Sequence, residues 1–295
     1  MCVPPATTVE TTEYGERMSG ACFVCVTCGV QFAPSSSPPA RCPVCEDGRQ
    51  YVGWDGQRWT TLEALRDGHA NRIEELEPGV TGIGTEPSFA IGQRALLVRT
   101  AEGNLLWDCI TLLDDATMAA VRGAGGVAAI AISHPHYYST MVDWSRAFDA
   151  PIHLHEADRR WVMRPDSAIH HWSGDALPLF GGLTLHRLGG HFPGATVCLW
   201  PDGAAGAGAL LAGDVLQVVP DRRYVSFMYS YPNLVPLPAH VVARMARRVA
   251  DLPFDRIYGA WWGRIVDRDG PAAVARSAQR YLAALSSEAD ELELG

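Results

Sequence analysis

The chain has 295 residues, of which 47% are hydrophobic, and a formal net charge of −9. That length is enough to bury a large core, either as one large domain or as a large domain with a small appendage. The excess of acidic residues argues against a nucleic-acid-binding protein, because affinity for the phosphate backbone rests on clustered Lys and Arg.

The first twenty residues are rich in Thr and Glu and lack a basic start followed by an apolar run. They do not resemble a secretory signal, so we expect a disordered leader over residues 1–20. No stretch reaches the roughly 18 consecutive apolar residues of a membrane-spanning helix. We therefore expect a cytoplasmic protein with no membrane contact, in which cysteines bind metal more often than they form disulfides.

Residues 21–53 form a segment that is rich in Pro and Ser and has no helical periodicity. Such a segment does not bury a core of its own, so another interaction must hold it together. Five of the eight cysteines of the chain fall here. We therefore predict a small metal-stabilised domain over residues 21–53.

Two Cys-x-x-Cys pairs stand in this segment, Cys25 with Cys28 and Cys42 with Cys45, separated by thirteen residues. Zinc prefers four tetrahedral thiolates, and each pair supplies two of them from one tight turn. The spacing predicts a structural zinc ribbon, with a rubredoxin-like iron as the alternative. Cys22 also forms a Cys-x-x-Cys with Cys25, but Cys25 and Cys28 match the second pair better. Whether the ribbon also serves as a docking module stays open.

Residues 54–295 have the composition of an ordinary globular domain with mixed helices and strands. Thr60 resembles the N-cap of a capping box with Glu63. The expected elements in chain order are a helix over 62–76, a hairpin of strands over 95–99 and 105–110, a helix over 115–122, a strand over 127–132, a helix over 140–148, strands over 151–154, 183–188, 196–200 and 209–212, a helix over 238–250, a strand over 256–258 and a helix over 271–285. This alternation indicates an α/β protein with helices on the outer faces.

Three histidines and one carboxylate stand at the ends of expected strands. His134 and His136 directly follow a continuous apolar run, and Pro135 favours an extended backbone at His134. Two side chains at i and i+2 of an extended segment point to the same side. His191 stands in a glycine-rich turn, and Asp214 ends another apolar strand, where a buried carboxylate needs a partner or a metal.

In order and spacing, these four residues resemble the metal ligands of the metallo-β-lactamase superfamily. His134 and His136 match the first two ligands of its His-x-His-x-Asp-His motif, His191 matches the third, and Asp214 matches the bridging carboxylate. The resemblance implies an αββα sandwich for residues 54–295, preceded by the zinc ribbon.

The departures from the family pattern affect its second metal site. Tyr138 and Ser139 replace the Asp and the second His of the motif, and residues 258–263 read Tyr-Gly-Ala-Trp-Trp-Gly where the last His is expected. The remaining ligands suffice for one ion, so we predict a mononuclear site of zinc or iron held by three His and Asp214.

The resemblance implies a metal-dependent hydrolase that acts on a small organic substrate such as an ester, thioester or amide. Asp214 and Tyr138 are the catalytic candidates, since the Tyr138 hydroxyl is able to bind a substrate oxygen. Two alternatives stay open: a mononuclear-iron oxidoreductase or oxygenase, and a non-catalytic module that binds a ligand or a partner.

We expect aromatic residues to line the substrate pocket. Tyr229 stands in a loop rich in Pro and aromatic residues, and Trp261 and Trp262 occupy the region of the missing last histidine. Arg264 is the candidate anion-binding group of this pocket. The alternative is that these aromatic residues only pack the loop against the core.

Overall fold

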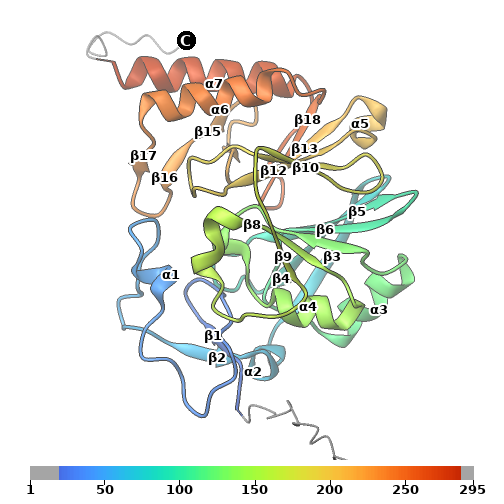
Figure 1. Ribbon diagram of the computed structural model, residues 1–295, viewed down its shortest axis with the longest axis vertical. Coiled ribbons are helices and arrows are strands. Elements are labelled where there is room, and N and C mark those ends of the chain that lie inside the picture. Colours follow the sequence, from blue (N-terminus) through green and yellow to red (C-terminus); the bar gives the residue numbers. More distant parts are fainter. Residues whose placement is uncertain (1–19, 287–295) are drawn as a thin grey trace, which may run out of the picture.

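The computed structural model describes residues 20–286, so the expected leader lies outside the described residues except for Gly20. Two sheets pack face to face, and helices cover their outer faces (Figure 1). Helices α3 and α4 lie on one side, and α6 and α7 lie on the other. This is the αββα sandwich that the resemblance implied.

The first sheet holds seven strands in sequence order: β3 (Ala70–Glu77), β4 (Val80–Glu86), β5 (Arg94–Thr100), β6 (Gly103–Trp107), β7 (Ala129–Ala131), β8 (Ile152–His155) and β9 (Ile169–Trp172). The second holds six: β10 (Ala176–Pro178), β11 (Thr184–Arg187), β12 (Thr196–Trp200), β13 (Ala209–Gly213), β18 (Arg256–Gly259) and β19 (Ile265–Val266). Three short pairs complete the strands: β1 (Phe23–Cys25) with β2 (Trp59–Thr61), β14 (Gln217–Val218) with β15 (Val225–Ser226), and β16 (Met228–Ser230) with β17 (Val235–Pro236).

The helices are α1 (Pro43–Glu46), α2 (Leu62–Arg66), α3 (Asp115–Gly123), α4 (Met141–Phe148), α5 (Gly203–Gly206), α6 (Ala239–Ala250) and α7 (Gly270–Ala284), with 3₁₀ turns at η1 (Pro135–Tyr137) and η2 (Glu156–Trp161). None of the helices in the described part of the chain has the length and apolar character needed to cross a bilayer.

The space between the two sheets is filled by apolar side chains from both. Trp107 and Leu105 of the first sheet belong to the same buried cluster as Trp200 and Leu211 of the second. Strands β6 and β7 are covered by α3 and α4 on their other face, which explains why the run before His134 is continuously apolar rather than alternating.

The prediction of a single helix over residues 62–76 is wrong. The segment over 62–76 divides into α2 and β3, because Gly68, at φ +87°, breaks the helix. The N-cap is Thr61 rather than Thr60, and its side chain accepts a hydrogen bond from the amide of Ala64. Ile73 therefore lies on a strand that pairs with β4. The hairpin of β5 and β6, α3, α4, α6 and α7 agree with expectation to within three residues.

The ribbon segment packs directly on the sandwich. Its first strand, β1, pairs with β2, which lies beyond residue 53. Cys25 and Val30 belong to the same buried cluster as Ile110 and Phe192 of the sandwich. The side chain of Gln31 donates a hydrogen bond to the Asp143 carboxylate in α4 at 2.7 Å. The predicted boundary at residue 53 stays a prediction, since the two segments share one apolar core.

Candidate metal centres

The four predicted ribbon cysteines lie together and are buried. Their sulfur atoms lie within 4.8 Å of one another; Cys25 Sγ is 3.5 Å from Cys45 Sγ, and Cys28 Sγ is 3.7 Å from Cys42 Sγ. Thiolates about 2.3 Å from a tetrahedral zinc are about 3.8 Å apart, so the arrangement fits such an ion. Cys22 is half-buried and lies outside the cluster, which confirms the pairing of Cys25 with Cys28.

The environment of the cluster favours ionised sulfur at its first ligand. Hydrogen bonds from Cys28, Cys42 and Cys45 hold the pKa of the Cys25 thiol well below its usual range. The side-chain amide of Gln57 also donates to Cys25 Sγ at 3.1 Å. Thiolate is the form that binds a metal.

The carboxyl ends of central strands in both sheets meet at one edge of the sandwich, and the predicted ligands lie there. His134 follows β7 with an extended backbone, at φ −170°, and Asp214 follows β13. A Cβ at Gly213, where φ is +56°, would lie 2.8 Å from Ser133 Oγ. The tight contact and the left-handed backbone explain why glycine stands directly before Asp214.

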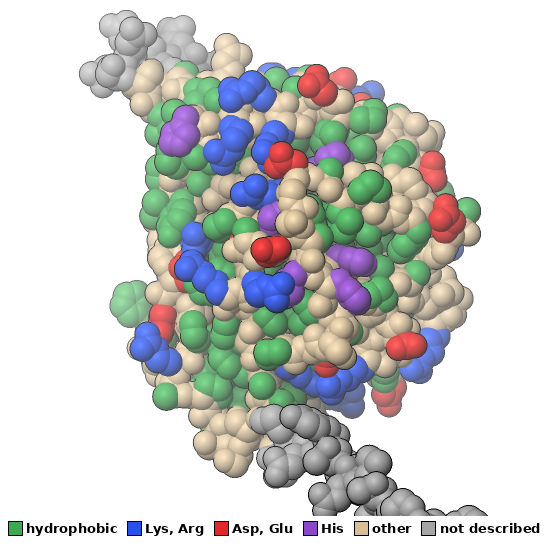
Figure 2. Space-filling model, in the orientation of Figure 1, with side chains coloured by type: hydrophobic (Ala, Val, Ile, Leu, Met, Phe, Trp, Pro, Cys, Tyr) green, Lys and Arg blue, Asp and Glu red, His purple; other side chains and the backbone are tan. Residues whose placement is uncertain are grey.

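The three predicted histidines converge. Ring nitrogens of His134, His136 and His191 lie within 4.8 Å of one another, and all three side chains are buried. Histidine side chains also reach the surface on the face shown in Figure 2. His136 stands in the 3₁₀ turn η1 rather than in the expected extended segment. The turn nevertheless keeps His134 and His136 on the same side of the chain.

Neighbouring groups determine which nitrogen of each ring faces the centre. His134 Nδ1 lies 3.0 Å from Ser133 Oγ, and His191 Nδ1 lies 3.1 Å from the Met228 carbonyl oxygen. The Nε2 atoms of these two rings are left for an ion. His191 Nε2 lies 3.2 Å from His136 Nδ1. Nitrogens about 2.1 Å from a tetrahedral ion are about 3.4 Å apart, so this spacing also fits a metal.

Asp214 lies beside this group without belonging to it. Its Oδ1 is 3.3 Å from His134 Nε2, but it is not close to all three histidines. Within residues 20–286, neither of these two buried atoms has a hydrogen-bond partner of normal geometry. A buried polar atom without a partner is costly, and a bound cation would satisfy both.

Burial determines the protonation of the site. It lowers the pKa of all three histidines, that of His191 to about 4, and the charge of Arg49 lowers them further. Neutral imidazole is the form that binds metal. Burial also raises the pKa of Asp214 to about 7. A cation in the site would offset the cost of the ionised carboxylate.

Tyr137, and not Tyr138, adjoins the ligands. The Tyr137 ring lies 4.4 Å from that of His134, and its hydroxyl lowers the pKa of Asp214. Neither tyrosine is among the described residues that line the cavity, and Tyr138 is buried within the influence of the Asp158 charge rather than that of Asp214. The placement does not support the predicted role of Tyr138. The reason is η1, which rotates the two tyrosines relative to an extended segment.

A cavity of about 350 Å³ opens onto the histidines. Its lining comes from three parts of the chain, namely the ribbon segment, the ligands and the later loops: Thr27, Gln50, Tyr51, Ala90, Ile91, His136, His191, Asp214, Gln217, Tyr231, Pro232 and Trp261. Of the four predicted substrate-binding residues, only Trp261 is among them.

The other three predicted pocket residues lie elsewhere. Trp262 packs on β3 and β4, where its ring lies 4.2 Å from the Arg72 guanidinium. Tyr229 packs against Arg49, and Tyr231 takes its place in the cavity. Arg264 stands at the start of β19, where its carbonyl accepts a hydrogen bond from the amide of Gly259. It is not among the described lining residues, so the predicted anion-binding role is not supported.

Asp108 is a site residue that the sequence analysis missed. It directly follows β6 at φ +59°, its Oδ1 accepts a hydrogen bond from the amide of Ser133 at 2.7 Å, and burial raises its pKa to about 7. The residue thereby fixes the backbone directly before His134. Its signal, a carboxylate at the end of an apolar strand, was the same one that identified Asp214.

Comparisons with known proteins agree with this architecture. No family model matches the chain. An uncharacterized protein of Bacillus subtilis (strain 168), YmaE, is 50% identical over 268 residues, which cover 90% of this chain and 97% of that protein. The solved structure of the metallo-β-lactamase DIM-1 aligns with a TM-score of 0.55 at 15% identity, over 72% of this chain and 98% of that one. A metallo-β-lactamase from Pontibacter korlensis aligns with a TM-score of 0.52 at 12% identity, over 74% and 100%.

The solved structures share the fold, and the sequence relative aligns over 90% of the chain. The chain therefore belongs to the same protein family as YmaE of Bacillus subtilis, built on the metallo-β-lactamase fold.

Proposed function

We propose that this protein is a metal-dependent hydrolase that acts on a small organic substrate, an ester, thioester or amide. One ion, zinc or iron, is held by His134, His136 and His191, with Asp214 beside it. The observation that carries the proposal is the convergence of buried imidazole nitrogens on one point, with His134 Nε2 and Asp214 Oδ1 lacking a hydrogen-bond partner of normal geometry among the described residues.

A single ion is supported by the residues around the histidines. Tyr138 and Ser139 stand where a second ion would need an Asp and a His, and Trp261 lines the cavity near the expected position of the last His. Among residues 20–286, the only clusters of metal-binding geometry are the three histidines and the four cysteines. We assign the four cysteines a structural zinc, since four buried thiolates leave it no open position.

When bound, such an ion polarises a carbonyl group and lowers the pKa of water toward about 7. The residues of the chain supply the rest of the chemistry. Asp214, with the Tyr137 hydroxyl beside it, is placed to hold a proton at the edge of the site. The rings of Trp261 and Tyr231 line the cavity and are placed to pack against the apolar part of a substrate.

The cavity restricts the substrate. Its volume of about 350 Å³ is at the small end of ligand pockets. The described residues that line it include no Lys or Arg, so no fixed positive side chain is present to anchor a carboxylate or phosphate. An uncharged acyl compound fits this lining better than an anion does.

The test uses full-length protein that has been stripped with a chelator and reloaded with zinc, cobalt or iron. We expect hydrolysis of 4-nitrophenyl acetate or an acetyl thioester to require the added ion and to be lost in His136→Ala. His170→Ala is the matched control, because that histidine is exposed and lies outside the cluster. Equal rates with and without metal in all three proteins would contradict the proposal, as would oxygen consumption without hydrolysis by the iron-loaded protein.

A further inference from the structure

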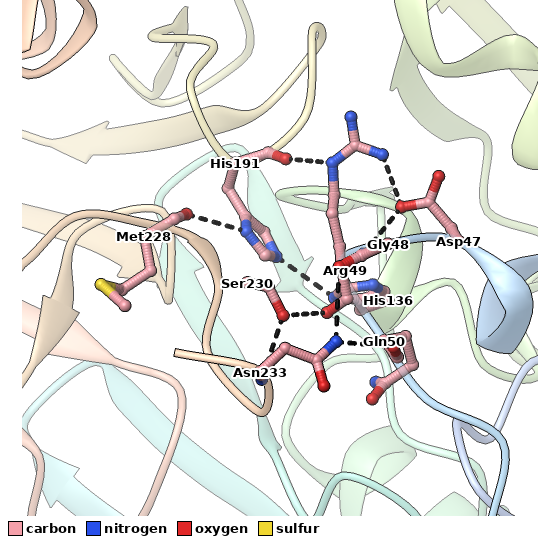
Figure 3. Close-up of polar contacts among 9 residues, drawn as sticks. All are labelled: Asp47, Gly48, Arg49, Gln50, His136, His191, Met228, Ser230 and Asn233. Atoms are coloured by element: carbon pink, nitrogen blue, oxygen red, sulfur yellow. Dashed lines mark hydrogen bonds and ion pairs between the residues drawn. The ribbon is translucent and has the colours of Figure 1, made fainter. Parts of the chain in front are cut away.

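The ribbon reaches the histidine site through a short segment, residues 47–51, which we call the strap. It begins directly after α1, the helix that carries Cys45. Figure 3 shows its contacts with the His191 turn and with β16 and the residues that follow it. Two strap residues, Gln50 and Tyr51, also line the cavity. The ribbon is thus part of the wall of the site.

Arg49 makes the central contact of the strap. Its Nε donates a hydrogen bond to the carbonyl oxygen of His191 at 2.7 Å. Its guanidinium lies between two rings, 4.4 Å from the centre of Phe192 and 4.6 Å from that of Tyr229. It also pairs with Asp47 at 2.7 Å, where the two side chains are only 10% and 16% exposed. A stacked, paired and buried arginine has little freedom to move.

Strand β16 contacts both Arg49 and His191. The hydroxyl of Ser230 donates to the carbonyl oxygen of Arg49 at 3.0 Å. Two residues earlier, the carbonyl of Met228 lies 3.1 Å from His191 Nδ1. The strap thus binds the backbone of His191 directly through Arg49. It also binds β16, the strand whose Met228 carbonyl contacts the His191 ring. Asn233 adds a hydrogen bond to the carbonyl of Gln50 at 2.9 Å.

His191 depends on such support more than the other two ligands do. His134 and His136 are fixed by the end of β7 and by η1, within the first sheet. His191 comes from the turn between β11 and β12 of the second sheet, directly after Gly189 and Gly190, both at positive φ. Glycines do not hold a turn rigid by themselves, so its position relies on contacts from outside.

We propose that Arg49 is a positioning residue for the histidine metal site, so that the four-cysteine ribbon and the histidine site form one structural unit. The inference rests on the proposed function in one respect, that His191 binds an ion. Groups that orient a metal ligand typically change metal affinity by about 10–100-fold when removed. The ribbon then has a role in the active site beyond its own stability.

The decisive variant is Arg49→Lys, which keeps the charge but loses the Nε donor and the planar stacking. Arg41→Lys is the matched control, since Arg41 lies in the same ribbon and pairs with Glu46 at the surface. Both full-length proteins are titrated with cobalt, whose thiolate charge-transfer bands distinguish the cysteine site from the histidine site. We expect Arg49→Lys to bind cobalt about 10–100-fold more weakly at the histidines and normally at the cysteines. Unchanged affinity at the histidines would overturn the proposal.

A second measurement does not depend on the ion at the histidines. Hydrogen exchange of the amides in residues 188–195 is measured on protein that holds zinc at the cysteines and no ion at the histidines. We expect faster exchange in Arg49→Lys and no change in Arg41→Lys. A wild-type protein that binds no cobalt at its histidines would contradict the proposed function, while its exchange data still report on the strap. Equal exchange in wild type and Arg49→Lys would contradict the positioning role alone.

Discussion

His134 Nε2 and Asp214 Oδ1 lie 3.3 Å apart, and within the described part of the chain neither atom makes a hydrogen bond of normal geometry. Both groups are buried, and burial favours the neutral form of each. Two such atoms side by side are costly unless a third group satisfies both. A cation that reaches His134, His136 and His191 is the simplest group that does so.

Replacing the carboxylate should therefore weaken ion binding. Asp214→Asn has nearly the same shape but no negative charge, and we expect its affinity for cobalt at the histidines to fall at least about tenfold. Competition with a chelator measures the change. Asp158→Asn is the control, because Asp158 is equally buried and lies outside both metal clusters. Unchanged affinity in Asp214→Asn would remove Asp214 from the site.

The two neighbouring tyrosines should differ in their effect on catalysis. Tyr137 lies against His134 and Asp214, whereas the charged group that influences Tyr138 is Asp158. We expect Tyr137→Phe to lower kcat for ester hydrolysis at least about tenfold, since its hydroxyl adjoins the proton-holding carboxylate. Tyr138→Phe should keep kcat within about twofold. A larger loss in Tyr138→Phe than in Tyr137→Phe would reverse this assignment.

The two neighbouring tryptophans, Trp261 and Trp262, should also differ in their effects, one on substrate binding and the other on stability. Trp261 lines the cavity and donates to the Ile91 carbonyl, while Trp262 packs on Gly82 and Gly84 of β4. Trp261→Ala should raise KM several-fold. Trp262→Ala should leave KM unchanged and reduce the free energy of unfolding by about 2 kcal/mol through lost packing. Steady-state kinetics and urea unfolding of both variants check this, and a raised KM in Trp262→Ala alone would contradict it.

Asp158 makes stability depend on pH in a defined direction. Burial raises its pKa to about 6, compared with about 3.9 in an unfolded chain. The native state binds the Asp158 proton more tightly than the unfolded chain does. The contribution of this proton to the free energy of unfolding is therefore fully present below about pH 4, declines between about pH 4 and 6, and is lost above that. Asp158→Asn keeps an oxygen that accepts from the amide of Gly194.

We therefore expect Asp158→Asn to increase the free energy of unfolding at pH 8 by up to about 3 kcal/mol, and by nothing at pH 4. Denaturant unfolding of metal-loaded protein at both pH values measures the difference. An equal effect at the two pH values would show that the carboxyl group does not titrate as described.

The candidate metal ligands could be identified from sequence because each stands at a position that the fold fixes locally. His134 and Asp214 end apolar strands, and the Cys-x-x-Cys pairs are single turns. Which of the two tyrosines faces the carboxylate was not predictable, because one 3₁₀ turn decides it and no periodicity reports such a turn. Likewise, a single left-handed glycine at Gly68 redirected the chain from helix to strand.

The contribution of the strap was outside the reach of sequence reasoning for a different reason. Arg49 and His191 are 142 residues apart, and the residues around Arg49 form no motif. Only the packing of the ribbon on the sandwich brings them together. A single sequence contains no signal for such a contact, whereas paired changes among relatives would.

The most direct test of the central claim is the number of metal ions per chain in protein purified without added metal. We expect two ions in the wild type, one at the cysteines and one at the histidines, and one ion in His191→Ala. A wild-type content of one, or of three, would contradict a single ion at the histidines, and so would a His191→Ala variant that retains two.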